Sequence, residues 1–180
     1  MKCLTPNEVS SWLAEKRQIE DPHHAHLDDI KHLLHSQFEA PTKYSVVEAF
    51  VRHFLNELVI EGDVLIQFVD SYPIHDHKRH VIESIRKMAG EDRHIEEAPG
   101  FLFCGEDREL ANTLFSLMTC FQWQCNLYGD HDQLTMFNWE GEIFDVWTSS
   151  ELKMKELKAI VQVFDFKPVA YASETNGTAP

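Results

Sequence analysis

Three histidines lie close together in the segment IHDHKRH, residues 74–80. His75, His77 and His80 have the spacing His-x-His-x-x-His, a few residues after Asp70. Neutral imidazole is a common metal ligand, and a carboxylate can complete a site that imidazoles begin. The segment follows an apolar run typical of a buried strand, and loops at strand ends often carry chemistry. One interpretation is therefore a divalent metal site formed by His75, His77, His80 and Asp70.

The same spacing partly resembles the first motif of metallo-β-lactamase-like hydrolases, which also follows a strand. The resemblance implies a metal-dependent hydrolase, but it covers only six residues. The family has an aspartate immediately before the last histidine, whereas Arg79 precedes His80 in this chain. The chain is also short for that fold, and the later ligands have no clear counterpart. We therefore do not assign the chain to this family, and we keep a metal-dependent hydrolase as the alternative function.

A second group of histidines falls on a helix that we predict from about residue 21 to residue 41. Four polar residues share one stripe of this helix at spacings of three or four: His24, Asp28, His32 and His35. The opposite stripe is apolar, with Leu27, Ile30, Leu34 and Phe38. A stripe opposite the core usually faces water. We therefore expect a solvated polar face, and a ligand set completed by another helix is the less favoured reading.

The remaining candidate groups offer weaker chemistry. Asp130, His131 and Asp132 fall at a predicted hairpin turn, where aspartate is common for backbone reasons. The four cysteines form no C-x-x-C pair, which predicts reduced and mostly buried thiols. The sequence contains no phosphate-binding loop, dinucleotide fingerprint, serine-nucleophile elbow or zinc-protease motif. Catalytic residues therefore stay unassigned, and we expect no cofactor apart from the divalent metal of the alternative.

The chain is strongly acidic, with a net charge of −14 at neutral pH, and the acid is unevenly spread. The segment 94–151 contains eleven Asp or Glu and a single Lys or Arg, Arg108. Such a field repels nucleic acid but suits a basic protein partner or a divalent cation. Together with the missing catalytic motifs, it favours a non-enzymatic protein-interaction or regulatory module. The oligomeric state is left open.

Length and hydropathy indicate a globular protein. The 180 residues suit one domain, and 43% hydrophobic residues can form a sizeable core. The longest apolar runs are far below the roughly 20 residues that span a bilayer. The first residues lack the apolar centre of a signal peptide, so we expect a cytoplasmic protein without a membrane segment.

Apolar periodicity and capping signals predict an α+β fold. We expect three N-terminal helices, in residues 4–16, 21–41 and 45–61. After them we expect a mixed β-sheet in the order β-α-β-α-β-β-β-α, backed by helices. Its strands fall in residues 63–70, 101–104, 125–129, 133–139 and 142–148. Residues 1–168 would form a single domain, and residues 169–180 a flexible C-terminal tail.

Overall fold

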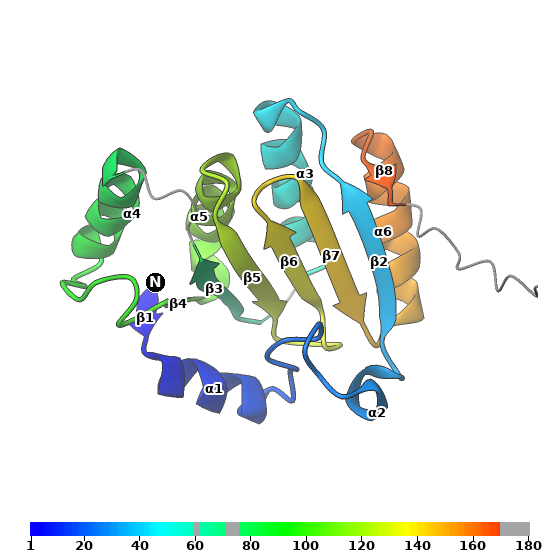
Figure 1. Ribbon diagram of the computed structural model, residues 1–180, viewed down its shortest axis with the longest axis horizontal. Coiled ribbons are helices and arrows are strands. Elements are labelled where there is room, and N and C mark those ends of the chain that lie inside the picture. Colours follow the sequence, from blue (N-terminus) through cyan, green and yellow to red (C-terminus); the bar gives the residue numbers. More distant parts are fainter. Residues whose placement is uncertain (60–61, 71–75, 170–180) are drawn as a thin grey trace, which may run out of the picture.

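The structure is a computed structural model that describes residues 1–59, 62–70 and 76–169. These residues form six α-helices and one eight-stranded sheet (Figure 1), which confirms the predicted α+β class. The helices are α1 (Pro6–Glu15), α2 (Leu27–Ile30), α3 (Tyr44–Glu57), α4 (Asp76–Met88), α5 (Arg108–Cys120) and α6 (Glu151–Val163). The strands are β1 (Lys2–Leu4), β2 (Leu34–Glu39), β3 (Val64–Asp70), β4 (Gly100–Phe103), β5 (Gln124–Gly129), β6 (Thr135–Trp139), β7 (Ile143–Thr148) and β8 (Lys167–Pro168).

The strands lie in the order β1-β4-β3-β5-β6-β7-β2-β8, and each neighbouring pair is antiparallel. The sheet is thus antiparallel where we expected a mixed one. A helix between two strands often makes them parallel, but here Gly100 at the start of β4 pairs with Gln67 in the middle of β3, and Phe103 at the end of β4 pairs with Val64 at the start of β3. The segment 89–99 brings the chain back to the sheet end that it left, so β4 runs antiparallel to β3.

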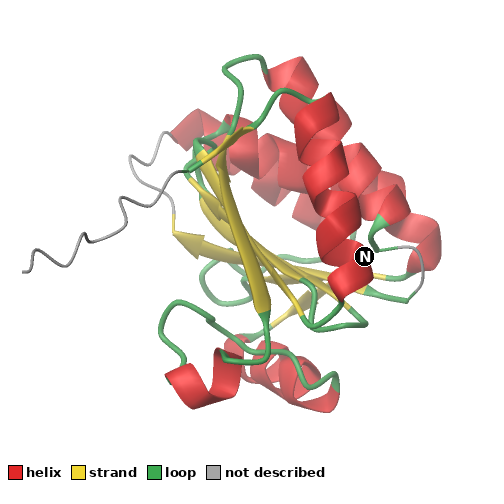
Figure 2. Ribbon diagram, turned by 90° about the vertical axis from the view of Figure 1, so that its right-hand side faces the viewer, coloured by secondary structure: helices red, strands yellow, loops and turns green. Residues whose placement is uncertain are grey.

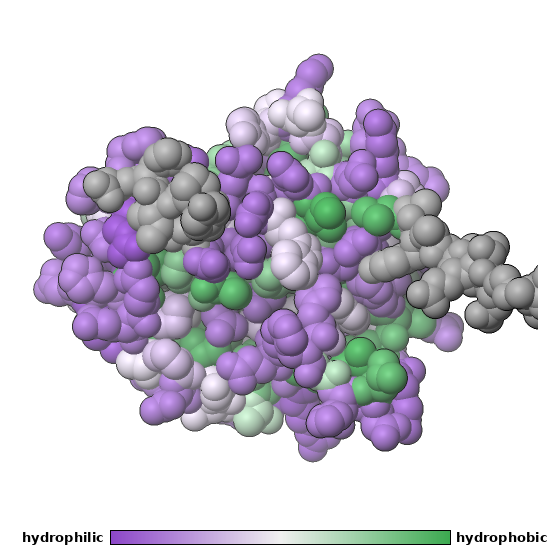
Figure 3. All heavy atoms as spheres, in the orientation of Figure 1, coloured by the Kyte–Doolittle hydropathy of each residue, from purple (hydrophilic) through white to green (hydrophobic). Residues whose placement is uncertain are grey.

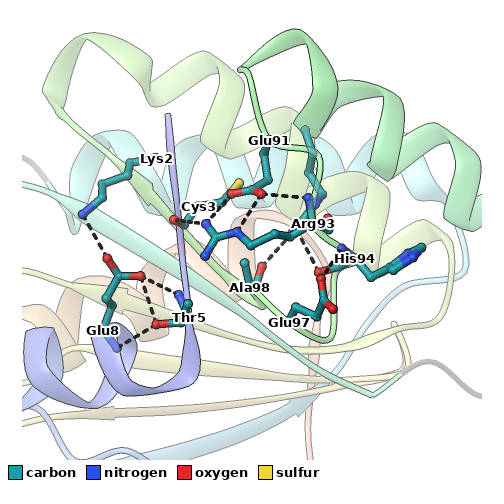
Figure 4. A network of polar contacts seen from close by, with 10 residues as sticks. Lys2, Cys3, Thr5, Glu8, Glu91, Arg93, His94, Glu97 and Ala98 are labelled. Atoms are coloured by element: carbon teal, nitrogen blue, oxygen red, sulfur yellow. Dashed lines mark hydrogen bonds and ion pairs between the residues drawn. The ribbon is translucent and has the colours of Figure 1, made fainter.

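The returning segment is held by two arginines. Arg86 on α4 is 1% exposed, and its guanidinium donates to the carbonyls of Ala98, Arg93 and His94 at 2.6, 2.9 and 3.1 Å. Arg93 points toward Glu91 and the carbonyl of Cys3 on β1 (Figure 4). The hydrogen bonds from Arg93 lower the pKa of Glu91 to about 2. The loop after α4 is therefore fixed to both α4 and the edge strand β1.

The sheet separates two layers of unequal size. Figures 1 and 2 show α3, α5 and α6 on one face, and α1 with α2 on the other side, below the strands. The larger core lies under α3, α5 and α6, and a smaller one lies under α1. The view in Figure 3 looks onto the face that the long helices leave uncovered. It is mostly hydrophilic, and hydrophobic side chains gather at α2, where Leu27 is 82% exposed.

The predicted helix over 21–41 is wrong. Only the four residues of α2 are helical there, and β2 follows, paired with β7 on one side and β8 on the other. The apolar residues Leu34 and Phe38 are four apart, which fits a helix, but they also fit a strand because four is a multiple of two. Pairing with β7 over six residues decides in favour of the strand.

Local signals predicted other elements well. Thr5 and Glu8 form the expected capping box at the start of α1, with Pro6 in the first turn. Ser45 and Glu48 also have the spacing of a capping box, but α3 begins at Tyr44 and has no side-chain cap. No helix in the described part of the chain is both long and apolar enough to cross a membrane.

The position of β3 can be tested by a buried charge. Ile66 is 0% exposed in the middle of the sheet, so Ile66→Asp would leave an unpaired carboxylate in the core. We expect a loss of about 3 to 5 kcal/mol in the free energy of unfolding, measured by urea denaturation. Val69→Asp is the control, because Val69 lies on the same strand and is 46% exposed. A control as unstable as Ile66→Asp would contradict the described register.

Candidate functional site

The predicted metal ligands are only partly described. His77 and His80 lie on the first turns of α4 and are exposed, and Asp70 ends β3. His75 lies outside the described residues. Within the described ranges, no group of three or more His, Cys, Asp or Glu side chains could hold a metal ion. The set of His75, His77, His80 and Asp70 therefore stays a prediction.

The two cations beside these histidines have structural partners. Cations in the first turn of a helix are unfavourable for the helix dipole. Lys78, however, donates to the carbonyl of Phe121 at the C-terminal end of α5, at 3.1 Å. Arg79 forms an ion pair with Glu96 at 2.6 Å. Both cations thus serve tertiary contacts that join α4 to its neighbours.

The upstream polar residues do not share a stripe, because the helix that would align them is absent. His24 contacts Asp21 at 2.7 Å, and Asp28 contacts Lys31 at 3.1 Å. His32 contacts Gln133 at 2.6 Å. Only His35, which lies on β2, reaches a buried acidic group.

That group is the carboxylate of Asp145 in the middle of β7, whose side chain is 0% exposed. From β2, the Nε2 atoms of His35 and Gln37 lie at 2.8 and 2.9 Å from its oxygens. From β6, Trp139 Nε1 donates at 2.6 Å. His23, in the segment between α1 and α2, brings Nε2 to 3.5 Å. We call these five residues the Asp145 cluster; it lies on the sheet face opposite α3, α5 and α6.

Aromatic rings hold the two histidines in place. The His35 ring stacks on Trp147, with centroids 4.6 Å apart and an interplanar angle of 17°. The His23 ring meets Phe137, Trp139 and Trp147 edge-on, with centroids 5.6, 5.1 and 4.5 Å away. The side chain of His23 is 26% exposed and that of His35 is 32% exposed, so water can reach both.

The electrostatics favour an ionised Asp145. Burial would raise its pKa, but the hydrogen bonds from His35, Gln37 and Trp139 outweigh burial and lower the pKa of Asp145. An ionised carboxylate only accepts hydrogen bonds, so Nε2 of His35 is the donor in this contact. Burial lowers the pKa of His23, although Asp145 acts in the opposite direction. The cluster fastens the segment before α2 to the sheet, because His23 contacts Asp145 from that segment.

Sequence reasoning missed this cluster. The predicted helix placed His35 on a solvated surface, so His35 was not matched with a strand partner. A signal was present in β7, where Ile143, Asp145 and Trp147 alternate with the buried Phe144 and Val146. A lone carboxylate inside an apolar strand indicates a buried charge with donors around it.

A second feature is a groove at the turn between β6 and β7. It encloses about 410 Å³, and its lining includes Glu39, Tyr44, Thr119, Glu140, Gly141 and Glu142; we call it the hairpin groove. Its three glutamates take part in no ion pair within the described part of the chain. The groove is therefore a concave site with three glutamates that form no ion pair within the described residues.

Backbone conformation shapes the hairpin groove. Gly141 has φ +76°, and a Cβ atom there would lie 2.4 Å from the carbonyl oxygen of Thr119. Only glycine lets the turn approach the end of α5 so closely. Glu140 also has a positive φ, 51°, so two successive residues of the turn between β6 and β7 are left-handed. The turn and the C-terminal end of α5 thus form one wall together.

A scan against models of protein families found no match, and searches of curated proteins and of solved structures found none either. The fold therefore points to no known activity by similarity. Charge, burial and side-chain geometry are the basis for assigning a function.

The Asp145 cluster predicts a large effect of removing one charge. In Asp145→Asn, an amide N–H₂ would face the donors of His35, Gln37 and Trp139, which leaves buried donors without an acceptor. We expect a loss of about 2 to 4 kcal/mol in unfolding free energy at neutral pH. Asp132→Asn is the control. The Asp132 side chain is 46% exposed, so its ion pair with Lys153 contributes little to stability. Equal stability of the two variants would contradict the described cluster.

His23 predicts a pH dependence. Its pKa is lowered on folding, so the unfolded chain binds the proton more readily and stability falls as pH drops below about 6.5. His23→Gln should reduce the slope of melting temperature against pH between about 7.5 and 5. His24→Gln is the matched control, because it removes the adjacent histidine, whose side chain is 84% exposed. A slope unaltered in His23→Gln would show that His23 titrates equally in both states.

Proposed function

We propose that this protein is an interaction module that binds a basic, extended segment of a protein partner in the hairpin groove. The observation that carries the proposal is the grouping of Glu39, Glu140 and Glu142 around one cavity, where no Lys or Arg of the described residues forms an ion pair with them. A cavity of about 410 Å³ is within the usual range for ligand sites. A lysine or arginine side chain would supply the missing countercharge.

The end of α5 adds to the negative potential. Thr119, in the last turn of α5, and Gln122, just after the helix, both line the hairpin groove. The C-terminal end of a helix carries a partial negative charge that favours cations. A basic side chain in the groove would meet this helix end together with the glutamates.

Many other acidic residues of the acidic segment already have partners. Their ion pairs join Asp107 to the N-terminal amine, Asp130 to Lys16, Asp132 to Lys153 and Glu96 to Arg79. In each of these pairs, a cation offsets the negative charge of the carboxylate. The hairpin groove differs because its charges are gathered and unpaired, which favours binding over mere solubility.

The proposal predicts specific, salt-dependent binding of a basic peptide. A fluorescent peptide of alternating lysine and glycine should bind the protein, and binding should weaken as salt rises from 50 to 300 mM, measured by anisotropy. Glu140→Gln with Glu142→Gln should weaken binding roughly fivefold or more, because two carboxylates of the groove are lost. The double variant should have the same melting temperature as the parent protein.

The matched control is Glu151→Gln with Glu156→Gln, which removes the same charge from α6. Glu151 follows the end of β7, whereas the hairpin groove lies at its beginning. An equal loss of affinity in the control would reduce the binding to overall charge. Binding that is independent of salt would also contradict a charged groove.

A further inference from the structure

The chain between α1 and β2, drawn in blue in Figure 1, is fastened on both sides of a short stretch that includes α2. Before this stretch, Tyr128 on β5 donates from its hydroxyl to the carbonyl of Glu20. After it, Nε2 of His32 lies 2.6 Å from Oε1 of Gln133, in the turn between β5 and β6. We call residues 21–31, which lie between these two contacts, the flap.

His23 connects the flap to the sheet. Its ring meets the rings of Phe137, Trp139 and Trp147 edge-on. Its Nε2 atom lies 3.5 Å from Oδ2 of Asp145. In the described part of the chain, no other residue of the flap forms a hydrogen bond, ion pair or ring contact with a strand. Phe137 and Trp147 are 7% and 5% exposed beneath this cover, so displacing His23 would open aromatic rings to water.

The carboxylate of Asp145 is already occupied by other donors. Its Oδ1 accepts from His35 and Gln37 at 2.8 and 2.9 Å. Its Oδ2 accepts from Gln37 and Trp139 at 3.1 and 2.6 Å. Each carboxylate oxygen has two lone pairs, so no acceptor site is left for His23. A protonated His23 would carry two N–H donors among aromatic rings, and its charge is better solvated when the flap is open.

The charged groups around His23 come from β7, β2 and the flap itself, since β6 presents only aromatic rings to it. Burial is the largest effect and lowers the pKa of His23. Asp145 and Asp21 act in the opposite direction, while His35 and His24 lower the pKa further. The closed flap therefore favours a neutral His23. Below a pH of about 6.5, the open flap binds the proton more readily, so the closed state loses stability as the pH falls.

We propose that the flap is a pH-sensitive cover, which opens when His23 is protonated and exposes the aromatic rings of β6 and β7. The contacts at Glu20 and His32 hold both ends, so the opening is local and the sheet stays intact. Within the flap only Pro22 is buried, so little apolar contact opposes the opening. This switch is separate from the hairpin groove and goes beyond the proposed interaction function.

Fluorine NMR of protein labelled with 5-fluorotryptophan tests the flap, because each tryptophan gives its own signal. Trp139 and Trp147 lie beneath His23, whereas Trp12 and Trp123 belong to the smaller and the larger core. The shift difference between H₂O and D₂O measures exposure to water. It should about double for Trp139 and Trp147 when the pH falls from about 7.5 to about 5, and stay constant for Trp12 and Trp123. No change at Trp139 and Trp147, or an equal change at all four, would overturn the proposal.

Variants at residue 23 identify the titrating group. His23→Phe keeps an aromatic ring but cannot be protonated, so Trp139 and Trp147 should stay covered at both pH values. His23→Lys is charged at both pH values and should expose the two rings at the higher one as well. His24→Gln is the matched control, because it removes the adjacent histidine, whose side chain is 84% exposed, and it should keep the response of the parent protein.

A response that persists in His23→Phe would assign the titration to another group of the Asp145 cluster and overturn the proposal. Rings that stay covered in His23→Lys would overturn it as well, because the charge would then not open the flap. None of these measurements involves the hairpin groove, so this proposal and the proposed function can fail separately.

Discussion

The buried carboxylate of Asp145 constrains the polar half of the structure. A charge in the interior must be surrounded by donors, and those donors come here from β2, from β6 and from the segment before α2. β2 must therefore lie beside β7 in one register, with Gln37 opposite Asp145. A shift by one residue would turn His35 and Gln37 into the apolar core and leave the carboxylate without its donors.

Because of this constraint, the two faces of the sheet differ in composition: one is apolar and the other is polar. On the helix-covered face, Phe38, Phe144 and Val146 pack under α3 and α6 as ordinary core residues. On the other face, the same strands carry histidine, glutamine, aspartate and tryptophan, held together by hydrogen bonds and ring contacts. The helices α3, α5 and α6 cover one face, while on the polar face His23 and His35 remain 26% and 32% exposed.

The sequence predicted the elements that have one strong period or a clear cap. The capping box of α1, the buried strand β3 and the meander from β5 to β7 were all evident from the residues themselves. The strand β2 was missed, since Leu34 and Phe38 satisfy both the helical and the strand period, and pairing with a distant strand decided between them. The Asp145 cluster was missed for the same reason: its members come from segments that only the sheet brings together. The unpaired glutamates of the hairpin groove were visible only as part of an overall acidity.

The position of β2 in the sheet also determines when, during synthesis, β2 can pair with β7. Its contacts with β7 join residues as far as 114 positions apart, as between Leu34 and Thr148. On a ribosome, β2 emerges early and has no strand to pair with until β7 has been made. Closing so long a loop costs entropy that local contacts do not offset, which slows the final step. β2 therefore cannot take its place beside β7 until residues 143–148 have been made, although it is synthesised more than 100 residues earlier.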